Sequence, residues 1–357
     1  MKILFSSYAY APSLGGIETV SALLTREFLA AGAEITLVTE TPPDAAANLD
    51  VDHLKPSNFP LLRHPSFQEM RRSLHWCDVV FQNNISLRHL IPALLARKPV
   101  LVVHQTWMRN TRGAVGWNDR IKRALARRVK NVAISEAIAH ELGLPAEIIG
   151  NPYDDAVFKL LSKAARDRDI VFVGRLVSDK GVDLLLRAVA RLNNRCLTIV
   201  GRGPDQENLR ALARELNVDA TFAGAKSGSE LDEILNRHQI IAIPSRWPEP
   251  FGVVALEGIA CGCVAVGSSE GGLAEAIGPC GLTFPNGDIE RLAQCLQQLL
   301  ESPGLREKFL AAAPAHLQRF RASSVAARYL AVLRTLLTPS AAKRSRGIPS
   351  HNLEVPP

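Results

Sequence analysis

The chain has 357 residues, of which 47% are hydrophobic, 22% charged and 6% aromatic. This composition excludes a disordered or collagen-like chain, and the length is sufficient for two domains that each bury a core. Lysine and arginine outnumber aspartate and glutamate by 42 to 35, a net charge of +7. Such a balance suits an anionic small molecule or an acidic membrane surface as well as nucleic acid.

The N-terminal sequence MKILFSSYAY has too short an apolar run for a secretory leader, and it predicts an opening strand. No apolar run reaches the roughly 18 to 20 residues that a membrane-spanning helix needs. We therefore expect a cytoplasmic protein, with peripheral contact to the inner face of the cytoplasmic membrane as an open alternative. Reduced thiols are the default for its six scattered cysteines.

Short apolar runs alternate with amphipathic stretches from one end of the chain to the other. The runs are continuous rather than alternating, as in parallel strands that helices cover on both faces. The strands predicted in the first half are residues 3–7, 35–39, 79–82, 100–104, 132–135 and 148–150, with a helix at 18–31. The strands predicted in the second half are residues 170–173, 197–200, 221–223, 240–244, 264–267 and 282–284. Further helices are predicted at 182–192, 204–216, 229–235, 253–260, 289–300 and 323–337.

Twelve strands are too many for one compact sheet, so the sequence predicts an α/β protein with two Rossmann-like, doubly wound parallel sheets. The boundary between them falls after residues 151–152, where a charged segment without apolar periodicity begins. In such sheets ligands bind beyond the carboxyl ends of the strands. The loops that follow the predicted strands are therefore the places to look for a site.

The first of these loops ends with Gly15 and Gly16, just before the predicted helix at 18–31. Glycines let a backbone approach a ligand closely, and a helix start offers free N–H groups to an anion. A plain glycine turn is an equally good interpretation of this loop taken alone.

The loop after the strand at 170–173 reads GRLVSDKG and begins with Gly174. Arg175 and Lys180 stand five positions apart on it, and both cations can converge on a diphosphate with a helix N-terminus behind them. A solvated basic loop is the alternative interpretation.

The loop after the strand at 197–200 carries Gly201 and Gly203. The dinucleotide fingerprint would require a third glycine at the position of Gln206, so this is not a nicotinamide site of the usual kind. Another pair, Gly271 and Gly272, opens a later short helix.

The most informative stretch is PSRWPEPFGVVALE at residues 244–257. Glu249 lies in its proline-rich loop, and Glu257 lies two turns into the following helix. Carboxylates at this spacing can bind hydroxyls at two points of an extended polyol ligand. The backbone N–H groups of Phe251, Gly252 and Val253 would meet an anion between them.

These motifs, in this order, resemble the GT-B fold retaining glycosyltransferases of family 4, the glycosyl transferases group 1. GRLVSDKG at 174–181, VGRGP at 200–204, the E-x7-E string at 249–257 and the stretch around 262–275 carry the resemblance in the second half. GGIE at 15–18, His104 and IGNPYD at 149–154 match more loosely.

The resemblance implies two Rossmann-like domains that face a central cleft. Residues 1–155 would form an N-terminal, acceptor-side domain, and residues 165–318 a C-terminal domain that binds the nucleotide sugar. A helix at about 320–337 would pack back on the first domain. The tail at 339–357 is rich in proline, serine and basic residues, which predicts disorder.

The resemblance also implies a role for each matching residue. Arg175 and Lys180 would bind the donor diphosphate, Glu249 the hydroxyls of the transferred sugar, and Glu257 the ribose. Gly15 and Gly16 would approach the donor from the opposing domain, with His104 beside the sugar. The implied catalytic residues are Arg175, Lys180, Glu249 and His104. The implied donor-binding residues are Gly15, Gly16, Gly174, Gly201, Gly203, Phe251, Gly252, Val253 and Glu257.

The implied reaction moves a hexose-type sugar from a nucleotide-diphosphate donor to a glycan or lipid-linked acceptor, with retention of the anomeric configuration. It needs no metal and no cofactor, and it belongs to the synthesis of cell-envelope polysaccharide or lipopolysaccharide. A nucleotide-sugar epimerase on a GT-B-like fold is the alternative. A nucleic-acid partner is not expected, because no helix-turn-helix, zinc or RNP-like signal accompanies the charge.

Two basic stretches in the first half raise the question of an anionic membrane surface. One is a short helix with Arg71 and Arg72, and the other is a predicted helix over residues 120–130. The apolar stripe of the second helix, Ile121, Leu125 and Val129, would equally suit docking into a core. The basic residues that could meet a membrane are Arg71, Arg72, Arg120, Lys122, Arg123, Arg127, Arg128 and Lys130.

Overall fold

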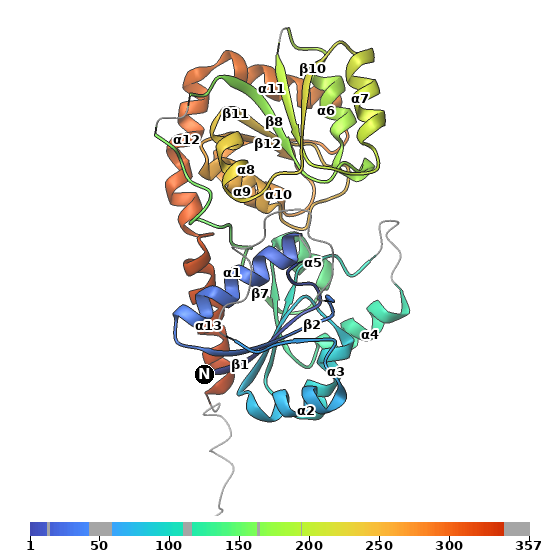
Figure 1. The fold of residues 1–357 in the computed structure, drawn as a ribbon, viewed down its shortest axis with the longest axis vertical. Coiled ribbons are helices and arrows are strands. Elements are labelled where there is room, and N and C mark those ends of the chain that lie inside the picture. The colour runs from blue at the N-terminus through green and yellow to red at the C-terminus, as the bar shows by residue number, and fades with distance from the viewer. Residues whose placement is uncertain (13–14, 43–58, 110–115, 163–164, 194, 339–357) are drawn as a thin grey trace, which may run out of the picture.

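A computed structural model describes residues 1–12, 15–42, 59–109, 116–162, 165–193 and 195–338. They form two α/β domains stacked along the long axis of the molecule (Figure 1). Each domain is built on one parallel sheet with helices on its faces, so the predicted fold class is confirmed. The predicted disordered tail at 339–357 lies outside the described residues.

The N-terminal domain contains a seven-stranded parallel sheet in the order β3-β2-β1-β4-β5-β6-β7. Three of its central strands are fully or almost fully buried and mostly apolar, as expected for a sheet covered on both faces. The strands are β1 (Lys2–Ser7), β2 (Glu34–Thr39), β3 (Leu61–Arg63), β4 (Val79–Asn83), β5 (Val100–His104), β6 (Lys130–Ala133) and β7 (Ala146–Ile148). Its helices are α1 (Gly16–Ala30), α2 (Phe67–Trp76), α3 (Leu87–Leu95), α4 (Trp117–Ala126) and α5 (Glu136–Leu142).

The C-terminal domain contains a six-stranded parallel sheet in the order β10-β9-β8-β11-β12-β13. The strands are β8 (Arg168–Val173), β9 (Cys196–Val200), β10 (Asp219–Gly224), β11 (His238–Ile243), β12 (Val264–Ser268) and β13 (Gly281–Phe284). The helices are α6 (Val182–Val189), α7 (Gln206–Glu215), α8 (Gly228–Asn236), α9 (Val253–Ala260), α10 (Leu273–Ile277), α11 (Ile289–Glu301) and α12 (Pro303–Gln318). Two 3-10 turns, η2 (Ser178–Lys180) and η3 (Gly278–Cys280), complete it.

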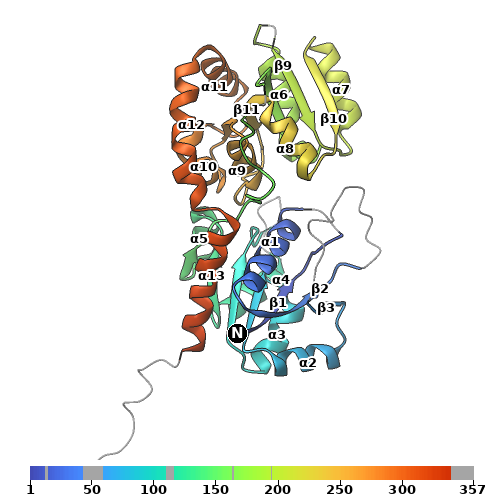
Figure 2. The ribbon, with the colours of Figure 1, turned by 60° about the vertical axis from the view of Figure 1, so that its left-hand side comes forward.

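The last helix, α13 (Ala322–Leu337), leaves the C-terminal domain and lies along the N-terminal one (Figure 2). The ring of Tyr329 meets that of Phe81 of β4 edge-on, with centroids 5.2 Å apart. The guanidinium of Arg328 donates a hydrogen bond to the carbonyl of Ile148 at 2.6 Å. These contacts tie the end of the chain to the first sheet.

The differences from the predicted elements have local causes. Strand β3 was not predicted, because its three residues are only half-buried and carry no long apolar run. The helix predicted at 120–130 is wrong in its limits, since α4 ends at Ala126 and Lys130 already begins β6. Helix α12 was not predicted, because its apolar residues do not repeat at helical spacing.

The loops at the carboxyl ends of β8 and β9 pack backbone against backbone. A Cβ atom at Gly201, whose φ is +146°, would lie 1.8 Å from the carbonyl oxygen of Gly174. A Cβ at Gly203 would lie 2.2 Å from that of Leu176. The two glycines therefore hold the loop after β9 against the loop that carries Arg175.

We expect Gly201→Ala to destabilise the protein, because the new methyl group meets backbone in an unfavourable conformation. The effect should be roughly 2–4 kcal/mol, or about 4 °C or more in Tm. Differential scanning calorimetry measures it. Gly304→Ala on α12 is the matched control, because a Cβ there meets nothing within 4 Å, and its Tm should not fall. Equal Tm values for Gly201→Ala and the unchanged protein would contradict this account of the two loops.

Candidate functional site

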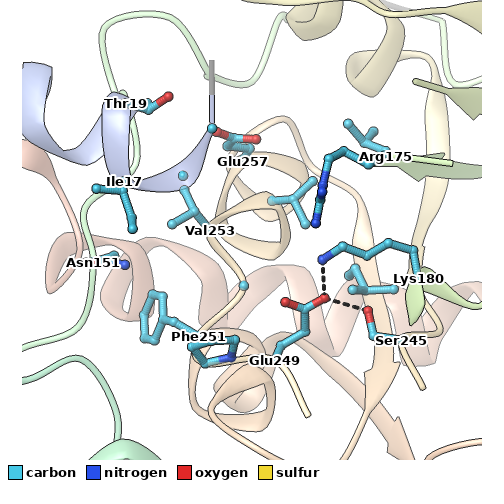
Figure 3. Close-up of a pocket in the computed structure, with 18 of the residues that line it drawn as sticks. Ile17, Thr19, Asn151, Arg175, Lys180, Ser245, Glu249, Phe251, Val253 and Glu257 are labelled. Atoms are coloured by element: carbon cyan, nitrogen blue, oxygen red, sulfur yellow. Dashed lines mark hydrogen bonds and ion pairs between the residues drawn. The ribbon is translucent and has the colours of Figure 1, made fainter. Parts of the chain in front are cut away.

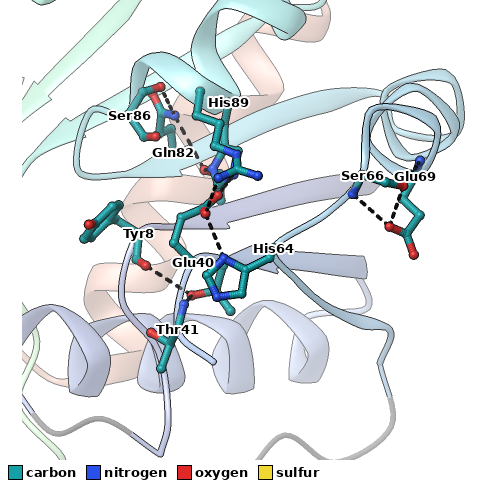
Figure 4. A network of polar contacts seen from close by, with 12 residues as sticks. Tyr8, Glu40, Thr41, His64, Ser66, Glu69, Gln82, Ser86 and His89 are labelled. Carbon is teal, nitrogen blue, oxygen red and sulfur yellow. Dashed lines mark hydrogen bonds and ion pairs between the residues drawn. The ribbon is translucent and has the colours of Figure 1, made fainter. Parts of the chain in front are cut away.

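A cavity of about 530 Å³ lies between the two domains (Figure 3). Most of its lining residues come from segments that follow strands, as expected when both parallel sheets direct their carboxyl ends toward it. From the N-terminal domain they are Gly15, Gly16, Ile17, Thr19, Gln105, Thr106, Ile134 and Asn151. From the C-terminal domain they are Phe172, Val173, Gly174, Arg175, Lys180, Ile243, Ser245, Glu249, Pro250, Phe251, Gly252, Val253, Val254 and Glu257.

Arg175 and Lys180 both reach the cavity from the loop after β8. The turn η2 brings Lys180 back toward the sheet and ends at Gly181, which has a φ of +68°. A Cβ at Gly181 would lie 2.0 Å from the carbonyl oxygen of Pro244, so glycine allows this loop to pack on the end of β11. The two predicted cations therefore line the same cavity wall, as Figure 3 shows.

Glu249 is held on both its side chain and its backbone. Its Oε1 accepts hydrogen bonds from Nζ of Lys180 and from Oγ of Ser245, each at 2.6 Å. Its carbonyl accepts one from the amide of Gly272 at 2.7 Å, beside a short parallel bridge to Gly271. The carboxylate is thus fixed in the cavity next to an ammonium group.

Helix α9 begins at the cavity with Gly252 in a left-handed conformation, φ +103°. A Cβ at this position would lie 2.5 Å from the side chain of Leu273, so the close packing also favours glycine. Phe251, Gly252 and Val253 all line the cavity. The start of an α-helix has free amides and favours negative charge, so this wall suits an anionic group.

Glu257, two turns along α9, faces the same cavity. Burial and the nearby Asp154 raise the pKa of its carboxyl to about 7. Near neutral pH this group is therefore partly protonated, and it can either donate or accept a hydrogen bond.

The wall from the N-terminal domain is built on buried amide side chains. Gln105 and Asn151 exchange two hydrogen bonds, at 2.7 Å and 3.0 Å, and Gln105 also donates to Asn83 at 2.8 Å. Asn83 in turn donates to the hydroxyl of Ser21 at 2.7 Å. This chain of amides connects the ends of β4 and β5 with the segment after β7 and fixes one side of the cavity.

Three residues of the predicted site lie elsewhere. The imidazole of His104 does not line the cavity but is buried beside Asn131, with Nε2 2.9 Å from Oδ1 of that residue. Burial lowers its pKa, which favours the neutral ring. Gly201 and Gly203 also do not line the cavity, because they serve the packing of the loop after β9 on the loop after β8. The structure therefore does not bring these three residues into the lining of the cavity.

The polar residues of the site that were not predicted include Ser245, Gln105 and Asn151. Each follows a strand directly or within a few residues, at the end of β11, β5 and β7. Their position after a strand was a usable signal, but residue type alone did not separate them from ordinary loop residues.

The basic residues of the predicted membrane surface fall into two groups. On and after α4, Lys122 pairs with Asp119, Arg123 with Glu141 and Lys130 with Glu147. Acids from outside residues 120–130 thus pair with three of these basic residues, while Arg120, Arg127 and Arg128 remain exposed. Arg71 and Arg72 are both exposed on α2.

Within the described part of the chain, no helix is long and apolar enough to cross a bilayer. The same residues contain no cluster of three or more histidine, cysteine, aspartate or glutamate side chains suited to a metal ion.

Two family profiles match consecutive parts of the chain. "Glycosyltransferase Family 4" matches residues 14–156, and "Glycosyl transferases group 1" matches residues 154–316. Together the two matches cover residues 14–316, and they support a GT-B group 1 glycosyltransferase. This agrees with the resemblance that the loop motifs carried and with the GT-B fold.

Among curated relatives, a D-inositol 3-phosphate glycosyltransferase of Acidothermus cellulolyticus is 37% identical over 185 residues, 47% of this chain and 41% of that protein. A glycogen synthase of Mycobacterium tuberculosis is 33% identical over 171 residues, 45% of this chain and 41% of that protein. The matched segments thus span less than half of either relative.

Solved structures share the fold of this chain. Anabaena HepE, solved in complex with UDP, superposes with a TM-score of 0.79 at 19% identity, covering 94% of this chain and all of that one. WaaG, a glycosyltransferase involved in lipopolysaccharide biosynthesis, superposes with a TM-score of 0.69 at 16% identity, covering 92% and 99%.

We expect Glu257→Gln to stabilise the free protein more at pH 8.5 than at pH 5.5. The folded-state pKa of Glu257 is raised, so its stabilising contribution is present at low pH and is lost as the pH rises through about 7. The neutral amide avoids that loss. Calorimetric Tm values at the two pH values measure the difference, with the exposed Glu233→Gln on α8 as control. A Tm difference that does not change with pH would contradict this environment for Glu257.

Proposed function

We propose that this group 1 glycosyltransferase moves a hexose-type sugar from a nucleotide-diphosphate donor to a glycan or lipid-linked acceptor, with retention of the anomeric configuration. The observation that carries the proposal is the convergence of Arg175, Lys180, Glu249 and Glu257 on one cavity between the domains. The two cations and the helix start suit the diphosphate of such a donor, which leaves with the nucleotide. The two carboxylates suit the hydroxyls of its sugar and its ribose.

Charge stabilisation is the main task in this reaction. As the bond between the anomeric carbon and the phosphate oxygen breaks, negative charge grows on the nucleotide diphosphate. Arg175 and Lys180 would stabilise that charge without a metal, together with the first amides of α9. The acceptor oxygen would attack from the face that the phosphate leaves, and its proton would pass to the leaving phosphate oxygen. Glu249 and Glu257 would act as binding groups rather than as a nucleophile.

The ion pair between Lys180 and Glu249 would change when the donor binds. A diphosphate carries more negative charge than one carboxylate, so it would compete with Glu249 for the ammonium of Lys180. Oε1 of Glu249 would then be available to a hydroxyl of the transferred sugar, with Ser245 still donating to it. Ribose hydroxyls would in the same way meet Glu257.

The similar structures support a nucleotide sugar as donor. HepE was solved with UDP and, in another crystal, with UDP-glucose. The relatives differ in acceptor, because one is named for inositol 3-phosphate and the other for glycogen. The involvement of WaaG in lipopolysaccharide biosynthesis supports, for this chain, a role in cell-envelope polysaccharide or lipopolysaccharide synthesis.

A nucleotide-sugar epimerase on the same fold is the less favoured function. It would need groups that remove and return a proton at the sugar. Among the described residues that line the cavity, the ionisable side chains are Arg175, Lys180, Glu249 and Glu257, and His104 is turned away. Two of these four side chains are cations suited to a diphosphate leaving group, so we favour sugar transfer over epimerisation.

A cytoplasmic location with peripheral contact to an acidic membrane is part of the proposal. Phe67 and Leu95 are 79% and 81% exposed, and both line a groove of about 330 Å³ between α2 and α3. The ionisable side chains in its lining, Arg71, His75 and Lys98, are all basic. Apolar side chains beside basic ones match acidic lipid headgroups and the acyl region below them.

We expect the double variant Phe67→Ser/Leu95→Ser to lose most binding to vesicles that contain phosphatidylglycerol, by about tenfold or more, because two apolar anchors are gone. Cosedimentation at low salt measures it, with phosphatidylcholine vesicles for comparison. The control is Leu160→Ser, an exposed leucine outside this groove. If the unchanged protein does not sediment with the acidic vesicles, or if the double variant sediments equally well, the membrane proposal fails.

We expect one nucleotide sugar in a panel of UDP-, GDP- and ADP-sugars to raise Tm. Arg175→Ala and Lys180→Ala should each abolish the rise, because each removes a cation that would pair with the diphosphate. The exposed Arg187→Ala on α6 should leave it intact.

In the same assay, Glu249→Gln distinguishes recognition of the sugar from binding of the nucleotide diphosphate. It should weaken discrimination among sugars while the free nucleotide diphosphate still raises Tm. Loss of nucleotide diphosphate binding in Glu249→Gln would contradict the role given to this carboxylate. Failure of every nucleotide sugar to bind or react would contradict the proposed function itself.

A further inference from the structure

The two residues that flank Glu249 both receive hydrogen bonds from the opposite domain. Nε1 of Trp107 donates to the carbonyl of Pro248 at 2.9 Å. The hydroxyl of Ser135 donates to the carbonyl of Pro250 at 2.8 Å. Trp107 lies in the loop after β5, and Ser135 is the N-cap residue of α5. Two elements of the N-terminal domain therefore form hydrogen bonds with one short loop of the C-terminal domain.

A third contact ties the support of that loop to the same domain. The amide of Glu136, in the first turn of α5, donates to Oε1 of Glu275 on α10 at 2.8 Å. Helix α10 follows Gly272, whose amide holds the carbonyl of Glu249. The N-terminal domain therefore contacts the residues on both sides of Glu249. Through α10 it also supports Gly272, which binds the backbone carbonyl of Glu249.

The loop depends on these contacts, because two of its three residues are prolines. Proline has no N–H group, so at 248 and 250 the carbonyls are the backbone groups that can form hydrogen bonds. Trp107 is itself held within its domain, since the guanidinium of Arg109 stacks over its ring at 4.8 Å. The neighbours of Trp107, Gln105 and Thr106, line the cavity.

We infer that Trp107 and Ser135 are positioning residues, through which the acceptor-side domain sets the place of Glu249 in the donor cavity. They do not line the cavity themselves. For the role of Glu249 toward the sugar, this inference rests on the proposed function. A carboxylate that is fixed before the ligand arrives loses less freedom on binding, which improves both affinity and orientation of the sugar.

Hydrogen–deuterium exchange tests the support without any ligand. Trp107→Phe keeps an aromatic ring and removes the N–H group. Exchange in peptides that cover residues 251–256 and 268–277 should become about fivefold faster in Trp107→Phe, and about thirtyfold faster in Trp107→Phe/Ser135→Ala. Trp117→Phe, at an exposed tryptophan on α4, is the matched control and should leave these peptides unchanged.

Ser135 has a second task, because its side chain also accepts a hydrogen bond from the amide of Ile138 at the start of α5. Faster exchange confined to α5 in Ser135→Ala reports only that lost cap. The single variant Trp107→Phe has no such second effect and decides the matter. Unchanged exchange at 251–256 and 268–277 in Trp107→Phe overturns the inference.

Binding and turnover then test the consequence, with UDP and UDP-glucose as probes. Trp107→Phe should bind UDP as the unchanged protein does, should bind UDP-glucose about fivefold more weakly, and should show a lower kcat. Equal loss for UDP and UDP-glucose would show a general structural effect and overturn the positioning role. If the unchanged protein uses no nucleotide sugar at all, the proposed function fails, while the exchange result still decides whether Trp107 holds the loop.

Discussion

The cavity exists because both sheets are parallel and direct the carboxyl ends of their strands to the same space. Every strand of a parallel sheet ends at one edge, so residues far apart in sequence become neighbours there. Within the C-terminal domain, the backbones of the loops at this edge approach one another more closely than side chains would allow. Glycine permits this at Gly201 against Gly174, at Gly181 against Pro244 and at Gly271 against Glu249. The positions of Arg175, Lys180 and Glu249 thus depend on contacts made where no side chain is present.

The junction between the domains is part of the hydrophobic core. One continuous cluster of buried residues includes Phe5 and Phe81 of the first domain together with Phe251 and Ile277 of the second. At the crossing, Phe251 packs on Phe320 with centroids 5.6 Å apart, and a Cβ on Gly150 would collide with both rings. Since Phe251 also lines the cavity, it belongs both to the apolar packing between the domains and to the wall of the cavity. Any change in how the domains pack therefore changes the site.

The sequence allowed a correct prediction of which loops meet at the sheet edges, but not of where each side chain points. Arg175, Lys180, Glu249 and Glu257 were located by spacing, because a loop after a strand or an early turn of the next helix must lie at the sheet edge. His104 also ends a strand, yet its ring turns toward Asn131 within the sheet. Successive side chains of a strand point to opposite faces of the sheet. No pattern in VLVVHQTW indicates whether His104 or Gln105 points toward the cavity. Trp107 and Ser135 could not be found this way, since their partners are carbonyls more than 100 positions away.

The charges of the cavity suit an anionic donor only because its two carboxylates are restrained in different ways. Glu249 is neutralised by the ammonium of Lys180, at 2.6 Å. Glu257 has no such partner among the residues that line the cavity, and burial instead raises its pKa to about 7, so a proton offsets part of its charge. Together with Arg175, the lining therefore carries a small net positive charge near neutral pH. Two cations against two fully ionised carboxylates would have cancelled. A diphosphate that draws Lys180 away from Glu249 would bring its own negative charge beside that carboxylate. The hydroxyl of Ser245 and the hydroxyls of a bound sugar would then be the groups that stabilise Glu249, which makes binding of the diphosphate and recognition of the sugar one coupled event.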